Sequence, residues 1–256
     1  MEFLRDTWYL FLRLVRASVR MPVFVIISIV QPMIWVVLFG QLYRAVTQIP
    51  GWRGGSFVQF LAPGIAIMTA IIGAAYSGMG ILADIDRGVL DRLLATPVSR
   101  GAVIAGRILH ASVQVIVQAS IILLVAFALG ARPHGGIPGL LSVLLSAALL
   151  AAAFASFSNG LALIARRQEL VIAVMNFTIL PLMFLSSMIM QPQLMPGWIG
   201  RVSRYNPLNW AVTAARLGFE GEDAARVMLS LALLAGLALL CGLLATRAFG
   251  RYRRTL

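Results

Sequence analysis

The sequence contains no lysine, a single cysteine and only two histidines. A nucleotide-binding loop of the G-x-x-x-x-G-K-[ST] type needs its lysine to reach the phosphates, so this chain cannot bind ATP through such a loop. The lone Cys241 excludes an intramolecular disulfide, and with two histidines it leaves too few ligands for a typical catalytic zinc site. We therefore expect no catalytic residue, no metal and no cofactor here. If ATP and Mg²⁺ supply energy, another polypeptide binds them.

Charged side chains are also scarce. Only 12% of the 256 residues are charged and 60% are hydrophobic, with a mean hydropathy of +0.91. These values exclude an ordinary soluble domain and predict an all-α polytopic membrane protein. The net charge of +12 could suggest nucleic-acid binding. The arginines, however, flank apolar runs instead of forming one patch, so we expect no nucleic-acid partner.

Six segments are long and apolar enough to span a bilayer, which takes about 20 residues. They are 22–43, 57–83, 101–129, 137–165, 170–190 and 224–249. Six spans place both termini on one side. That side would hold 14 of the 21 arginines and the other side seven, so the positive-inside rule predicts that both termini are cytoplasmic.

The segment 1–20 alternates arginines with apolar residues and predicts an amphipathic helix lying in the membrane interface. Trp8 and Phe11 would anchor it among the headgroups. A frayed tail is the alternative.

The stretch 84–100, DIDRGVLDRLLATPVSR, separates two apolar runs. It carries five charges within nine residues: Asp84, Asp86, Arg87, Asp91 and Arg92. A charge at the bilayer centre costs about 2.5–3.5 kcal/mol, so this stretch should lie outside the hydrocarbon. Apolar residues at 3–4-residue spacing predict a short cytoplasmic helix over 84–97, ended by Pro97. Such a helix either lies in the headgroups or docks into another protein.

A polar stripe runs along the third predicted span. Arg107, His110, Gln114 and Gln118 share one helical face, with Arg107 near enough to the cytoplasmic end to extend its head toward water. Two interpretations stay open, a translocation path and interhelical hydrogen bonding in the bundle interior. Tyr76 in span two and Asn176 in span five belong to the same prediction. For Ser77, Ser158 and Asn159 we expect a helix-packing role, and for Pro181 a kink in span five.

The external segment 191–218, between the last two spans, is rich in proline and tryptophan. Asn206 followed by Pro207 predicts a helix start that continues through about Leu217, with Gly218 and Gly221 as breakers. We expect short re-entrant helices here, with Trp210 at headgroup depth.

The order of these features resembles the ABC-2 family of ABC exporter permeases. Residues 86–94, DRGVLDRLL, and their ATPVSR sequel are similar to the family's acidic-basic-Gly-Thr-Leu-Glu-x-Leu pattern followed by Thr-Pro. Asp86 and Asp91 stand where the family often has glutamate, and Val89 where it has threonine. The segment Asn206-Pro207-Leu208 leading to Arg216 is similar to the family's Asn-Pro-Leu segment. The resemblance covers nearly the whole chain.

The drug-resistance branch, with daunorubicin-exporter-like permeases, is the most similar. It implies a single transmembrane domain over 1–256 in a bacterial cytoplasmic membrane, surrounded by lipid and paired with a second copy of itself. An ABC ATPase subunit would power export of an amphipathic drug-like or lipid-linked substrate. The resemblance also implies that 84–97 is the coupling helix. Its contact residues would be Asp86, Arg87, Gly88, Leu90, Asp91, Arg92, Leu93 and Leu94.

Other functions remain open. Polysaccharide and lipo-oligosaccharide exporters share the six-span plan. A secondary transporter or channel without an ATPase would be expected to have repeated halves and acids in mid-span; a non-transport scaffold ranks third. An intramembrane serine protease could only pair Ser77 with His110, and that pattern is nonspecific.

Overall fold

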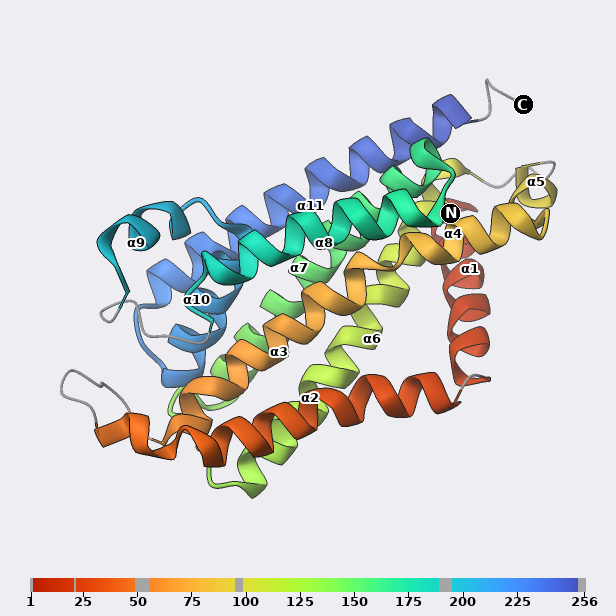
Figure 1. The fold of residues 1–256 in the computed structure, drawn as a ribbon. Coiled ribbons are helices and arrows are strands. Elements are labelled where there is room, and N and C mark those ends of the chain that lie inside the picture. Colours follow the sequence, from red (N-terminus) through yellow and green to blue (C-terminus); the bar gives the residue numbers. More distant parts are fainter. Residues whose placement is uncertain (1, 21, 49–55, 95–98, 189–194, 253–256) are drawn as a thin grey trace.

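The structure is a computed structural model that describes residues 2–20, 22–48, 56–94, 99–188 and 195–252. Within these ranges every regular element is helical, as the composition predicts. The elements are α1 (Glu2–Val19), α2 (Pro22–Leu42), η1 (Arg44–Gln48), α3 (Phe57–Ala75), α4 (Gly78–Asp86), α5 (Val89–Leu94), α6 (Arg100–Ala128), α7 (Gly136–Ala165), α8 (Gln168–Phe184), α9 (Gly197–Ser203), α10 (Pro207–Glu220) and α11 (Ala224–Tyr252). The long helices form a bundle, and α1 crosses it at the end that carries both termini (Figure 1).

Within the part of the chain that the structure describes, four helical segments are long and apolar enough to cross a membrane. They are Phe57–Asp86, Gly101–Ala128, Gly136–Ala165 and Ala224–Gly250. The first and fifth predicted spans correspond to shorter apolar helices, Ile26–Leu42 and Gln168–Phe184. The fifth ends six residues before the predicted 190, where the Ser186 hydroxyl donates to the Met183 carbonyl and the chain turns. A count of six spans therefore stays a prediction.

Helix α7 lies at the centre and packs against α3, α6, α10 and α11. Its contact faces are rich in small residues such as Ala151 and Ala155, which are fully buried. At Gly160 an added Cβ would lie 3.3 Å from Cα of Ala245 on α11. Small side chains allow close approach of membrane helices, so α7 serves as the common packing partner.

The second predicted span is interrupted at Tyr76–Ser77, between α3 and α4, although we predicted one helix over 57–83. Two residues of α7 bind this break. The Gly78 amide donates to Oγ of Ser158 at 3.0 Å, and Nδ2 of Asn159 donates to Oγ of Ser77 at 3.2 Å. The segment Phe57–Asp86 is still long and apolar enough to cross a membrane. The break within it is tolerated because side chains from another helix satisfy groups that helical hydrogen bonds would otherwise satisfy.

The helix predicted at the N-terminus is present as α1. Trp8 is 53% exposed, as an interfacial anchor requires, but Phe11 is buried against the protein. Gly106 of α6 makes this packing close, since an added Cβ there would lie 3.2 Å from the Thr7 carbonyl oxygen. Phe11 therefore fastens α1 to the bundle, and its predicted role in the headgroups was wrong.

The external helix α10 extends beyond the predicted Leu217 to Glu220. Gly218 does not break it but packs against Ser142 of α7, where any side chain would overlap the serine. The helix ends at Gly221, whose φ of 76° is a left-handed conformation that favours glycine.

Candidate functional site

The predicted cytoplasmic helix over 84–97 is in fact a bend, which we call the α4–α5 elbow (residues 84–94). Helix α4 runs to Asp86, and Gly88 then turns the chain with a φ of 64° before α5 begins. One continuous helix was predicted, and this was wrong because the left-handed glycine ends α4. Ala95–Val98, including Pro97, lie outside the described residues.

The elbow presents charge outward and hydrophobic surface inward. Asp86, Arg87 and Arg92 are exposed, whereas Leu90 is completely buried in the core of the same chain. Leu90 therefore holds α5 on the bundle and is not free to contact a partner, which corrects one predicted contact residue. Leu93 is half-buried; Asp91 and Leu94 lie within α5, but their side chains are outside the described set. A docking role for the elbow stays a prediction.

At the start of the elbow, Asp84 binds two arginines from other helices. Its Oδ1 lies 2.9 Å from Nη2 of Arg13 on α1, and its Oδ2 accepts a hydrogen bond from Nη2 of Arg107 on α6. The Arg107 side chain is 6% exposed and also donates to the Gly80 carbonyl at 3.2 Å. Arg107 is therefore an internal ion-pair partner, and the predicted extension toward water was wrong.

Sequence reasoning missed Asp84, which it grouped with the exposed charges. One signal was present. The acid ends one apolar span and the arginine stands near the start of the next, so a chain that turns back brings both to a similar depth.

The polar stripe on α6 faces a cavity of about 520 Å³ between α1, α2, α3 and α6. All four stripe residues and Tyr76 line it, so the structure brings five of the six predicted path or interior residues together. Nε2 of His110 lies 2.9 Å from Oγ of Ser18, and Nε2 of Gln118 donates to Oγ of Ser28 at 3.0 Å. Residues of the stripe thus form hydrogen bonds with other helices and also border the cavity.

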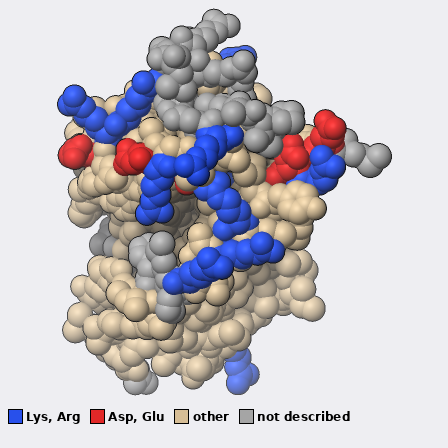
Figure 2. Space-filling model, turned by 90° about the vertical axis from the view of Figure 1, so that its right-hand side faces the viewer, with Lys and Arg blue, Asp and Glu red and all other residues tan. Residues whose placement is uncertain are grey.

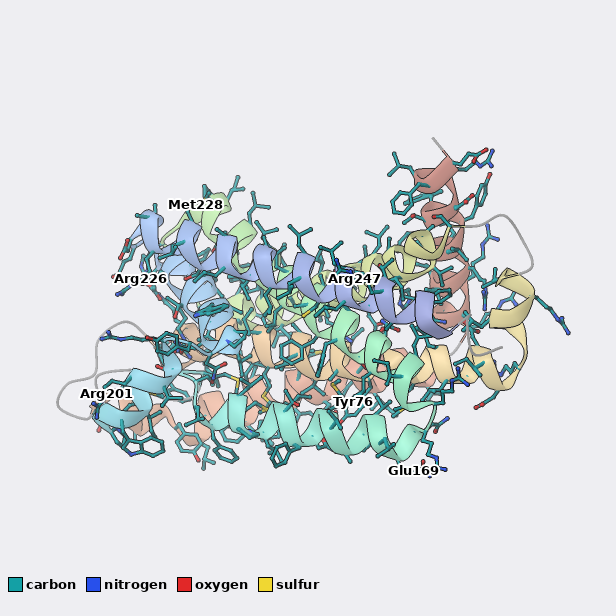
Figure 3. All side chains as sticks on the ribbon, turned by 90° about the horizontal axis from the view of Figure 1, so that it is seen from above. Tyr76, Glu169, Arg201, Arg226, Met228 and Arg247 are labelled. Carbon is teal, nitrogen blue, oxygen red and sulfur yellow. The ribbon has the colours of Figure 1, made fainter. Side chains whose placement is uncertain are left out.

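Asn176 is the sixth residue of that prediction and does not line the cavity. It accepts a hydrogen bond at Oδ1 from the Tyr76 hydroxyl at 2.8 Å. Tyr76 lies along the bundle between the α9 end, marked by Arg201, and the start of α8 at Glu169 (Figure 3). Asn176 therefore binds Tyr76, which lines the cavity, without lining the cavity itself.

The external helices are fastened at their start by Asn206. Its Oδ1 accepts from the Leu208 amide at 2.9 Å, and its Nδ2 donates to the carbonyls of Leu182 and Leu185. The predicted cap before Pro207 is thus confirmed, and it also ties α10 to the end of α8. Nε1 of Trp210 donates to the Arg204 carbonyl at 2.7 Å.

Arg216 on α10 is a second buried cation. Its guanidinium donates to the carbonyls of Phe60, Ser187 and Met188 and stacks 3.6 Å above the Phe60 ring. One side chain therefore joins α10, α3 and the segment after α8. In the sequence, Arg216 stands out only as the end of the Asn206-Pro207-Leu208 segment, so its role as a buried cation was not predicted.

The groups considered for catalysis are engaged elsewhere. Ser77 accepts from Asn159, and His110 bonds to Ser18, so each has a partner other than the one a serine protease requires. Among the described residues no cluster of three or more His, Cys, Asp or Glu could hold a metal ion.

Arginines gather at the end of the bundle that carries the elbow and both termini (Figure 2). Exposed examples are Arg16, Arg20, Arg87, Arg92 and Arg167. This is the distribution that the predicted cytoplasmic side requires.

Several known proteins are similar to this chain over most of its length. A family model described as ABC-2 type transporter matches residues 5–219. The daunorubicin resistance ABC transporter permease protein DrrB1 of Streptomyces coeruleorubidus is 26% identical over 80% of this chain and 71% of its own length. The putative transport permease ycf38 of Cyanophora paradoxa is 30% identical over 84% and 74%, respectively. The probable doxorubicin resistance ABC transporter permease protein DrrC of Mycobacterium tuberculosis is 27% identical over 80% and 73%.

Proposed function

This chain belongs to the ABC-2 type transporter family, and from that premise we propose that it is the membrane-spanning subunit of an ABC exporter. A separate ABC ATPase subunit supplies the energy, since the chain has no lysine for a nucleotide-binding loop. Two copies of the chain enclose the route of an amphipathic drug-like or lipid-linked substrate. Relatives named for daunorubicin and doxorubicin resistance support the drug-like choice.

The proposed topology has six spans in a bacterial cytoplasmic membrane, with both termini in the cytoplasm. Four long apolar helices and two shorter ones supply the spans. The arginine-rich end of the bundle also carries both termini and the elbow, which supports this orientation (Figures 1 and 2).

The α4–α5 elbow carries this proposal. It combines a charged surface at Asp86, Arg87 and Arg92 with a buried anchor at Leu90. A surface charge pattern of this kind orients a protein partner, while the anchor lets a push on α5 reach the helices behind it. Gly88 and the half-buried Leu93 belong to the same proposed contact surface.

Co-purification tests the partner. Tagged chain solubilised from its native membrane should retain an ABC ATPase subunit with ATP hydrolysis, and Arg92→Glu should remove most of it. The matched control is Arg201→Glu, an equally exposed arginine on α9 at the opposite end, which should retain the ATPase. Failure of the unchanged chain to bring down any ATPase, or equal losses with both variants, would reject the proposal.

Substrate class is tested separately in liposomes that contain the assembled complex. Daunorubicin, a lipid-linked oligosaccharide and a phospholipid are each compared for stimulation of ATP hydrolysis. We expect daunorubicin to stimulate. Stimulation by the oligosaccharide alone would assign the chain to the polysaccharide exporters. Flux driven by an ion gradient without ATP would indicate a secondary transporter.

A further inference from the structure

The cavity between α1, α2, α3 and α6 lies within one chain. At about 520 Å³ it falls within the range of pockets that hold drug-sized ligands, roughly 300–1,000 Å³. Helix α8 contributes no residue to its lining. Because the described lining residues all belong to one chain, the cavity does not require a second copy.

Its walls carry hydrogen-bonding groups that the fold has not used. Gln118 is 4% exposed, and its Oε1 has no hydrogen-bond partner among the described residues, although its Nε2 binds Ser28. A buried carbonyl oxygen without a donor is unfavourable. This oxygen is sealed within the protein, so the Gln118 amide gains a donor from a molecule in the cavity only by turning toward it. Gln31 and Gln114 also line the cavity and present amide groups to it.

Charge on the walls is already balanced. Arg107 is the one arginine among the described lining residues, and its guanidinium is engaged by Asp84 and by the Gly80 carbonyl. No aspartate or glutamate stands among the described lining residues, so no carboxylate there would neutralise a cationic ligand, and aromatic rings such as Trp35 offer it only a weaker attraction. The lining also includes apolar and aromatic side chains such as Trp35, Ile72 and Met68.

We propose that this cavity binds an uncharged, partly aromatic amphipathic molecule that forms a hydrogen bond with Gln114 and donates one to the Gln118 amide oxygen once that amide turns toward the cavity. The inference rests on the proposed export of amphipathic molecules and adds the location and the charge class of the ligand. Neutral ligands bear hydroxyl or amide donors that match the glutamines. A cation would lose its hydration without gaining an anionic partner.

The test uses the full-length chain in phospholipid nanodiscs and two probes, daunorubicin and its aglycone, which lacks the charged amino sugar. Quenching of tryptophan fluorescence is measured, and Trp35→Phe identifies the part that arises in the cavity. We expect saturable, Trp35-dependent binding of the aglycone, at least as tight as that of daunorubicin. Gln118→Leu should weaken aglycone binding about ten-fold.

Two further variants keep the result interpretable. Gln114→Leu removes an amide that makes no hydrogen bond within the described structure, so the fold should tolerate it while aglycone binding weakens. Ser120→Ala lies on the same helix outside the cavity and should leave binding unchanged. Binding that survives both glutamine variants, binding that does not depend on Trp35, or a clear preference for daunorubicin over the aglycone would each overturn the inference. Probe binding in the cavity and co-purification of the ATPase are separate measurements, so this inference and the proposed function can fail independently.

Discussion

Nη2 of Arg13 lies 2.9 Å from Oδ1 of Asp84, across 71 positions of the sequence. This contact ties α1, which lies at the edge of the bundle, to the last turn of α4. Because Arg107 binds the other carboxylate oxygen, Asp84 connects three elements: the N-terminal helix, the cavity wall and the start of the elbow. A movement of the elbow would therefore displace the carboxylate that binds Arg13 and Arg107.

The first prediction concerns this acid. Asp84→Asn removes the negative charge and leaves the buried Arg107 without its counter-ion, which costs about 3 kcal/mol when a buried pair is broken on one side. We expect a clearly lower midpoint of thermal unfolding in detergent, followed by tryptophan fluorescence. Asp86→Asn, at an exposed site two residues away, is the control and should change the midpoint little. Equal midpoints for the two variants would mean that the ion pair does not stabilise the bundle.

The second prediction concerns the guanidinium of Arg216. Lysine keeps the charge but cannot reach three separate carbonyl groups and stack on Phe60 at the same time. Arg216→Lys should therefore destabilise the chain by about 2 kcal/mol, seen as a lower thermal midpoint. Arg226→Lys changes an arginine whose side chain is 65% exposed, and it should remain within about 0.5 kcal/mol of the unchanged chain. An unchanged thermal midpoint for Arg216→Lys would mean that the Arg216 contacts with the three carbonyl groups and Phe60 do not stabilise the chain.

The third prediction tests the close packing at the α3–α4 break. A Cβ at Gly78 would lie 2.7 Å from Oγ and 2.8 Å from the carbonyl carbon of Ser158, so Gly78→Ala should cost about 1–3 kcal/mol through overpacking. Gly236 of α11 has open space around an added Cβ, and Gly236→Ala should be neutral or slightly stabilising. Thermal unfolding of both variants measures the difference, and the absence of one would argue against a rigid contact at the break.

The fourth prediction concerns the backbone of the elbow and depends on the proposed ATPase partner. Gly88 has a φ of 64° and no atom within 4 Å of an added Cβ, so Gly88→Ala changes only backbone conformation. A left-handed alanine costs about 1–2 kcal/mol, which should unbend the elbow and lower substrate-stimulated ATP hydrolysis by the complex. Asparagine tolerates this conformation better, so Gly88→Asn should retain more activity than the alanine variant. The reverse order would show that the bend is not required.

Local patterns in the sequence predicted much of the architecture. The apolar runs, the charged stretch after residue 83 and the Asn206-Pro207 helix start all correspond to observed elements. The polar stripe on α6 was predicted as one face because a 100° rotation per residue needs no knowledge of other helices. Some errors occurred where one helix packs on another, at Phe11 and at Gly218, and one occurred where the left-handed Gly88 ends α4.

What the sequence by itself determined is the class of protein, the helices and the side on which arginine accumulates. Periodicity, composition and caps operate within a few turns of one helix, so one sequence is enough to read them. The tertiary structure alone decided that Asp84 pairs with Arg13 and Arg107, and that Ser18 meets His110 across 92 positions to close one side of a cavity. Such contacts depend on how far apart helices cross and at what depth, and small residues at the crossings of α7 fix both quantities.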